Sequence, residues 1–136
     1  MKLKRKGAKR LVALRGATQC KNEVQDIQTQ VAALYDELLC KNRLQEKDLV
    51  SVLFSVTPDL TVQNPAAALR QSGRALDLAL FAVQEAVVQG SMPRVIRVLI
   101  HGYLGERVGI AHVYRNGAEA LRPDRADPSS SLHSFS

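Results

Sequence analysis

Two mostly apolar segments, residues 76–88 and 94–103, constrain the fold most. A Gly-Ser-Met-Pro turn separates them, and aliphatic side chains dominate both, which predicts two buried β-strands. Each segment carries a charge that an apolar core does not tolerate, Glu85 in the first and Arg97 in the second. A buried charge without a partner costs several kcal/mol. Arg97 is therefore expected to point out of the sheet, to pair with a carboxylate such as Glu85, or to bind an anionic ligand.

An amphipathic pattern predicts one long helix between residues 22 and 40. Its apolar side chains recur at spacings of three and four residues and so form one face: Val24, Ile27, Val31, Leu34 and Leu38. Asn22 is the expected N-cap, with Gln25 at the third position of a capping box.

A second, shorter helix is expected over residues 65–71. Asn64 is a suitable N-cap and Pro65 suits the first helical position. Ala66 and Arg70 are four residues apart, so they would lie on one face of this helix.

Three further strands are expected at residues 11–18, 49–56 and 110–115, and residues 118–121 would continue the last one after a tight turn. Gly16 indicates a bulge or a close approach of another backbone. The order of elements predicts an α/β (α+β) fold with one mixed five-stranded sheet, one long helix and one short helix. Two helices cannot cover both faces of such a sheet, so we expect an oligomer in which sheet faces meet.

The chain of 136 residues suits one domain, which we place at residues 11–124. The net charge of +6 arises within residues 1–10, because the rest of the chain has equal numbers of basic and acidic residues. We interpret residues 1–10 as a disordered, solubilising extension rather than a nucleic-acid-binding arm. Residues 125–136, rich in Ser, Pro and Asp, are expected to be a disordered tail.

Several function classes have no signal in the sequence. No apolar run reaches the ~20 residues of a membrane helix, so a cytoplasmic protein is expected. Cys20 and Cys40 lack metal-ligand spacing and are interpreted as inert thiols, and no Asp, Glu or Cys completes a ligand set for His101 and His112. There is no Ser-His-Asp or Cys-His arrangement and no Gly-rich phosphate loop. Neither a metal nor a cofactor is expected.

Charged and phenolic side chains next to apolar or special backbone are the candidates for a binding site: Arg15, Arg70, Glu85, Arg97, Tyr114 and Arg122. Arginine grips carboxylates through two parallel hydrogen bonds, so a converging set would suit a small dianion. The ordinary alternatives are a solvated surface cation for Arg15 and Arg70 and an aromatic on an edge strand for Tyr114. For Glu85 and Arg97 the alternative is an ion pair or a solvated strand face.

Seven short motifs occur in an order that is similar to the monofunctional chorismate mutases of the trimeric, β-rich class. They span residues 14 to 124, about four-fifths of the chain: LRGAT (14–18), SVTPDL (55–60), PAAALR (65–70), QE (84–85), IRV (96–98), HVY (112–114) and LRPD (121–124). The resemblance implies a homotrimer that forms a pseudo α/β-barrel, with active sites at subunit interfaces. It also implies the cofactor-free Claisen rearrangement of chorismate to prephenate in phenylalanine and tyrosine biosynthesis.

The resemblance also implies roles for individual residues. Arg15 and Tyr114 would hold the enolpyruvyl carboxylate of the substrate. Arg97 would reach the ether oxygen and a carboxylate, and Glu85 would accept from the ring hydroxyl. The residues implied at the rim are Arg122 and, from a neighbouring subunit, Arg70.

Further substrate contacts are implied at Asn64, Ala66, Ala82 and Leu121. The chain departs from the family here, because an aromatic is frequent at the position of Asn64, Lys at that of Ala67, and a thiol or hydroxyl at that of Ala82. These departures concern substrate affinity rather than the type of reaction.

Two other function classes stay open on the sequence. A trimeric imine or enamine deaminase also binds carboxylates with an interface arginine, although it would not account for Glu85, Arg97 and the LRPD motif together. The second is a non-catalytic binding module that uses the basic N-terminal extension.

Overall fold

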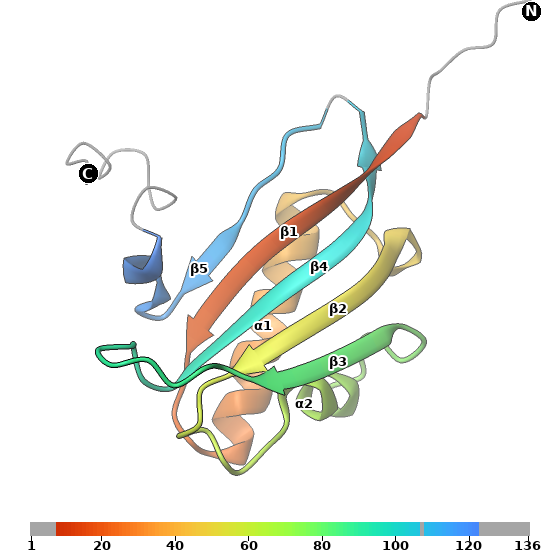
Figure 1. The fold of residues 1–136 in the computed structure, drawn as a ribbon. Coiled ribbons are helices and arrows are strands. Elements are labelled where there is room, and N and C mark those ends of the chain that lie inside the picture. Colours follow the sequence, from red (N-terminus) through yellow and green to blue (C-terminus); the bar gives the residue numbers. More distant parts are fainter. Residues whose placement is uncertain (1–7, 107, 123–136) are drawn as a thin grey trace, which may run out of the picture.

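A mixed sheet with the strand order β3-β2-β4-β1-β5 forms the centre of the molecule (Figure 1). The computed structural model describes residues 8–106 and 108–122. Strand β4 is antiparallel to both β1 and β2, whereas β3 and β5 run parallel to their neighbours β2 and β1 at the two edges. The strands are β1 (Lys9–Gln19), β2 (Leu49–Val56), β3 (Ala79–Gln84), β4 (Val95–Gly105) and β5 (Val113–Arg115). The predicted five-stranded mixed sheet is confirmed.

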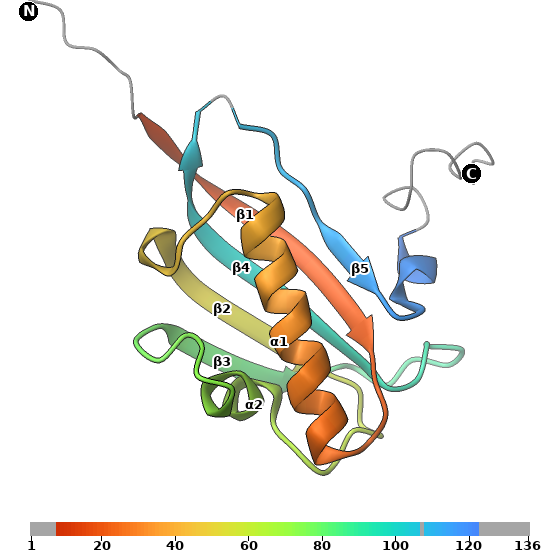
Figure 2. The same cartoon turned by 180° about the vertical axis from the view of Figure 1, so that it is seen from behind.

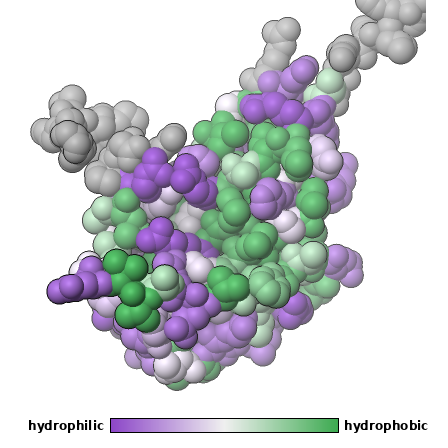
Figure 3. Space-filling model, in the orientation of Figure 1, coloured by the Kyte–Doolittle hydropathy of each residue, from purple (hydrophilic) through white to green (hydrophobic). Residues whose placement is uncertain are grey.

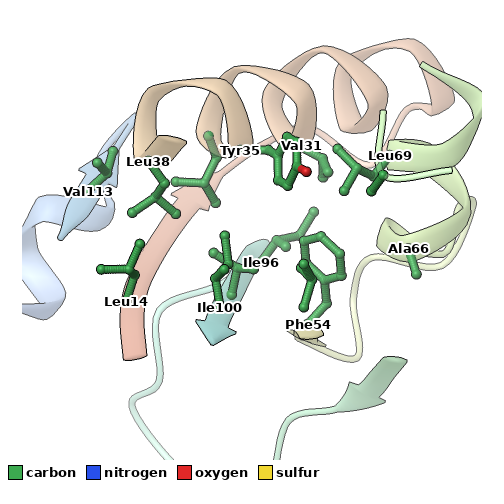
Figure 4. Packing of buried hydrophobic residues seen from close by; sticks show 14 of the residues in the cluster. Leu14, Val31, Tyr35, Leu38, Phe54, Ala66, Leu69, Ile96, Ile100 and Val113 are labelled. Atoms are coloured by element: carbon green, nitrogen blue, oxygen red, sulfur yellow. The ribbon is translucent and has the colours of Figure 1, made fainter. Parts of the chain in front are cut away.

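Both α-helices, α1 (Val24–Lys41) and α2 (Pro65–Gln71), lie on the same face of the sheet (Figure 2). Val31 and Leu38 of α1 point toward the sheet, where Leu14 of β1 and Ile100 of β4 face the helix, and all four side chains are buried (Figure 4). Burying one such side chain stabilises the fold by about 1.5–3 kcal/mol. The core therefore lies between α1 and the sheet. Two short 3-10 helices, η1 (Glu46–Asp48) and η2 (Ala118–Leu121), complete the fold.

The start of α1 differs from the prediction. Its N-cap is Glu23 rather than Asn22, and the expected capping box with Gln25 does not form. The side chain of Asn22 instead accepts hydrogen bonds from the backbone N–H groups of residues 61 and 62, so a contact with a distant loop replaces the local cap. Val24 is exposed, and Tyr35 takes a place on the buried face of the helix.

The prediction for α2 is partly confirmed. Asn64 caps the helix, because its side chain accepts from the backbone N–H groups of Ala66 and Ala67. Ala66 is buried whereas Arg70 is exposed, so the two do not present one common surface as predicted.

Two strands are shorter than predicted. Strand β3 covers residues 79–84 instead of 76–88, since its partner β2 ends at Val56, which pairs with Gln84. Residues 110–112 lie outside β5, and residues 118–121 form η2 rather than a continuing strand. Asn116 and Gly117 both have positive φ angles, so they form the predicted turn, but the turn leads into η2, whose Ala118 packs against Ala17 and Val95 of the sheet.

The folded part begins two residues earlier than predicted. Lys9 and Arg10 belong to β1 rather than to the N-terminal extension. The Lys9 ammonium bonds Asp48 at 3.0 Å, and the Arg10 guanidinium donates to the backbone oxygen of Val108 at 2.8 Å. Residues 1–7 of the predicted extension and the predicted tail 125–136 lie outside the described residues. Within the described residues, no helix has the length and apolarity to span a membrane.

The second face of the sheet, here called the open face, has neither helix over it (Figure 1). Apolar side chains gather on it over the strands, with charged residues between them (Figure 3). Its exposed large apolar residues are Leu11, Leu53, Phe81, Val83 and Tyr103. The strands are thus apolar on both faces, as the sequence indicates, but the helices cover only one of these faces.

Gly16 lies where β1 packs directly against Leu34 and Leu38 of α1. The pairing of β1 with β4 runs through this position without a register shift, so there is no bulge. A Cβ atom on Gly16 would lie 2.9 Å from both the Leu38 Cδ1 atom and the Val113 backbone oxygen. The predicted close approach is confirmed, and it joins α1, β1 and β5.

Gly16→Ala is expected to lower the free energy of unfolding by about 1–3 kcal/mol, because the added methyl group overpacks this contact. Urea denaturation followed by circular dichroism measures the change. Gly109→Ala is the matched control, since a Cβ there meets no atom within 4 Å. Equal stability of the two variants would contradict the close packing around Gly16.

The two thiols are expected to differ in reactivity. Burial, reinforced by the nearby Asp26 carboxylate, raises the pKa of Cys20 to about 11, whereas Cys40 is exposed. Since the thiolate is the nucleophile, iodoacetamide at pH 8 should label one cysteine per chain. Mass spectrometry of peptides identifies it, and Cys40→Ser should abolish the fast labelling. Equal labelling of Cys20 and Cys40 would contradict the burial of Cys20.

Candidate active site

The strand register brings residues from all five strands into one row across the open face. Ser55 of β2 pairs with both Val83 of β3 and Arg97 of β4. Ala17 of β1 pairs with both Arg97 and Tyr114 of β5. Side chains that are directly opposite on paired strands point to the same face of a sheet. The row therefore places Arg97 in the middle of the open face, between Ser55 and Tyr114.

Arg97 forms an ion pair with Glu85, which follows β3 directly. The Arg97 Nε atom lies 2.9 Å from the Glu85 Oε2 atom, and the Ser55 hydroxyl donates to the same oxygen at 2.5 Å. The Arg97 side chain is 50% exposed and that of Glu85 is 21% exposed. Two of the expectations for Arg97 hold together, since it points out of the sheet and pairs with a carboxylate.

Arg97 also lies at the boundary of two depressions on the open face. The first has a volume of about 370 Å³ and is lined by Arg15, Tyr114 and Arg122, with apolar walls from Leu53, Val83 and Leu99. The second has a volume of about 430 Å³ and is lined by Glu85, Leu121 and the segment between β3 and β4. Both volumes are in the range of sites for small molecules. Because Arg97 lines both, one ligand can contact arginines on one side and the Glu85 carboxylate on the other.

Six of the predicted site residues thus line these two depressions: Arg15, Glu85, Arg97, Tyr114, Leu121 and Arg122. They come from positions as far apart as β1 and the end of η2. The sequence indicated the residue types, and the sheet register brings them together.

Four predicted site residues lie elsewhere in the single chain. Asn64 caps α2, Ala66 packs into the core, and Arg70 is exposed on the same helix, on the other side of the sheet (Figure 2). Ala82 alternates with the exposed Phe81 and Val83 along β3 and packs against the core, so it faces the helices. None of the four lines either depression in one subunit.

Ser55 was not among the predicted site residues, although it lies within one of the quoted motifs. Its contact with the Glu85 carboxylate depends on the register of β2 between β3 and β4. The apolar walls Leu53 and Leu99 were missed for the same reason. Alternation by two residues along 49–56 indicates that Leu53 and Ser55 share a face, but not which face this is.

A hydrogen bond links Arg15 of β1 to the segment before β5. The backbone N–H of Arg15 donates to the His112 Nδ1 atom at 3.0 Å. His112 thus contacts the backbone of a predicted site residue. In the part of the chain that the structure describes, no cluster of three or more His, Cys, Asp or Glu side chains could hold a metal ion.

A half-exposed arginine–carboxylate pair, flanked by further arginines on an uncovered sheet face, has the chemistry that a small anionic ligand requires. The chain belongs to the chorismate mutase type I family, whose model matches residues 11–125. It is thus an isomerase of aromatic amino acid biosynthesis that rearranges chorismate to prephenate.

Individual relatives agree with this assignment. A chorismate mutase (AroH) of Thermus thermophilus is 43% identical over 94 residues, which cover 65% of this chain and 76% of the relative. The corresponding protein of Bacillus subtilis (strain 168) is 30% identical over 113 residues, 82% of this chain and 89% of the relative. A solved chorismate mutase structure from Clostridium thermocellum is similar with a TM-score of 0.74 and 38% identity, covering 81% of this chain and 99% of that one. The deaminase and binding-module alternatives find no support in these matches.

Proposed function

We propose that chorismate binds across the two depressions of the open face, with Arg97 at its ether oxygen and Glu85 at its ring hydroxyl. The observation that carries this proposal is the Arg97–Glu85 ion pair, at 2.9 Å, in the same row as Tyr114. Chorismate is a dianion with one hydroxyl group. The depressions offer cations for its carboxylates and a carboxylate for its hydroxyl.

The proposed role of Arg97 follows from the charge that develops during the reaction. In the rearrangement the C–O bond breaks ahead of C–C bond formation, so negative charge grows on the ether oxygen. A fixed guanidinium at that oxygen stabilises the transition state more than the ground state. Because the contact with Glu85 uses the Nε donor, the Nη groups of Arg97 are the donors proposed for the substrate.

The other arginines are proposed to hold the substrate in its reactive conformation. Arg15 and Tyr114 line the first depression and would bind the enolpyruvyl carboxylate, with Arg122 and Leu121 at the rim. Restricting the flexible enolpyruvyl group in this way removes unproductive conformations before the reaction begins.

We further propose a homotrimer, a pseudo α/β-barrel in which the open faces of three subunits meet and the active sites lie at the interfaces. The exposed apolar side chains of the open face, such as Phe81 and Val83, support this proposal, since burying them would be favourable. The exposed Arg70 and Asn64 would then contact the site of a neighbouring subunit, because they line neither depression of their own chain.

The location of the enzyme and the ends of its folded domain also stay predictions. We propose a cytoplasmic enzyme whose folded domain extends to residue 124. Its N-terminal boundary moves from residue 11 to Lys9, with which β1 begins.

Arg97→Ala is expected to lower kcat by about 100- to 1,000-fold, the cost of removing one donor to a developing anion. Arg97→Lys should recover part of the loss, because it restores the charge without the planar fork. The decrease of chorismate absorbance measures both. Arg74→Ala is the control, since Arg74 pairs with Asp36 away from the depressions. Turnover of Arg97→Ala close to that of the unaltered enzyme would overturn the role of Arg97.

Phe81→Asp is expected to dissociate the proposed trimer, because it places a charge among the apolar side chains of the open face, where Phe81 is 61% exposed. Sedimentation velocity at micromolar concentration measures the mass of the particle. Val24→Asp is the matched control, since Val24 is 46% exposed on α1, away from the open face. A fully active monomer of the unaltered chain would contradict the trimer and its interface sites.

A further inference from the structure

Strand β5 carries Tyr114 but has little pairing of its own to hold it. It consists of three residues, Val113–Arg115, and within the described residues it pairs only with β1. Tyr114 nevertheless forms a wall of the first depression. Three ladder positions at the edge of a sheet are a weak constraint on the place of a side chain. Two side chains at the C-terminal end of α1 supply further hydrogen bonds that hold the segment around Tyr114.

Asn42, the C-cap residue of α1, holds the chain just before β5. Its side chain is fully buried. The Nδ2 group donates to the backbone oxygen of Ala111 at 2.8 Å and to that of Leu38 at 2.7 Å, and the Oδ1 atom accepts from the backbone N–H of Ala111 at 2.8 Å. The amide thus bonds both backbone groups of Ala111 and one carbonyl at the helix end, where carbonyls lack partners within the helix.

Glu37, one turn earlier on α1, holds the chain at the end of β5. Its Oε1 atom accepts from the Arg115 Nη1 group at 2.7 Å, and its Oε2 atom lies 2.9 Å from the Lys41 ammonium. Burial alone would raise the pKa of Glu37, but the hydrogen bonds from Lys41 and Arg115 hold it below its usual range. The carboxylate is therefore charged at neutral pH, and its contact with Arg115 persists there.

These contacts lie on both sides of Tyr114 and on the opposite face of the sheet from the depressions. Ala111 precedes Tyr114 by three residues, and Arg115 follows it directly. Ala111 also adjoins His112, whose ring accepts the backbone N–H of Arg15. Neither Asn42 nor Glu37 lines a depression, and the hydrogen bonds described above connect both to the segment 111–115.

We propose that Asn42 and Glu37 are positioning residues, which fix both ends of the β5 segment against α1 and so place Tyr114 at the substrate. This inference rests on the proposed role of Tyr114 in binding the enolpyruvyl carboxylate. A purely structural role would lower stability without a selective effect on substrate binding.

A double-mutant cycle separates the two roles, because residues that act through one another are not additive. Asn42→Ala should raise KM, by no more than Tyr114→Ala does because it acts through that residue, with a smaller change in kcat. In the Tyr114→Ala background the same substitution should leave KM nearly unchanged while still lowering Tm. Val31→Ala is the control for lost stability, since Val31 is buried on α1 but lies about three turns before the helix end that contacts residues 111–115. It should lower Tm and leave KM as it is.

The outcomes are distinguishable. If Tyr114→Ala alone leaves kcat and KM unchanged, the proposed role of Tyr114 fails, and the positioning inference fails with it. If Tyr114→Ala raises KM but Asn42→Ala multiplies KM by the same factor in both backgrounds, only the positioning inference is overturned.

Glu37→Gln keeps the inference testable if Asn42→Ala does not fold. The Glu37 side chain is 29% exposed, so the glutamine variant is expected to fold, and it removes the charge that holds Arg115. It should raise KM in the unaltered background and have little effect beside Tyr114→Ala. An unchanged KM in Glu37→Gln would overturn the role of Glu37.

Discussion

The structure depends on one constraint, which is that two helices cover only one face of a five-stranded sheet. The side chains of α1 and α2 bury most of one face, and this contact supplies the core. The strands nevertheless carry apolar residues on the other face as well, where Leu53 and Phe81 are exposed. An apolar surface of this kind is unusual on a stable monomer. The proposed active site lies on this surface, so the same feature that calls for a partner also presents the proposed catalytic groups.

The Arg97–Glu85 ion pair is better explained by function than by stability. Half-exposed ion pairs contribute about 0–1 kcal/mol, because water and salt screen them. Arg97 is 50% exposed, so the fold gains little from holding this pair in an otherwise apolar strand region. What the pair does provide is a guanidinium of fixed orientation, held by a carboxylate that Ser55 also binds. A fixed cation costs no reorganisation when charge develops on a substrate.

Helix α1 serves both the core and the proposed site. One face supplies buried side chains, and its C-terminal end, through Asn42 and Glu37, contacts the short edge strand that carries Tyr114. Gly16 lies between these parts, since any side chain there would separate β1 from α1 and β5. The contacts that build the covered face therefore also hold the segment that carries Tyr114 to the open face.

The sequence by itself determined the class of fold, the long helix, the Asn64 cap and the residue types of the site, because hydrophobic periodicity and local capping act between near neighbours in the chain. It also carried the family motifs that placed Glu85, Arg97 and Tyr114 among the candidates. Tertiary structure decided the start of α1, where Asn22 bonds a distant loop, and the short β3, which ends where its partner ends. It also decided that Ser55 meets Glu85. Register between strands is a long-range property, since a shift by one residue turns every side chain to the other face, and no local pattern in this chain specifies it.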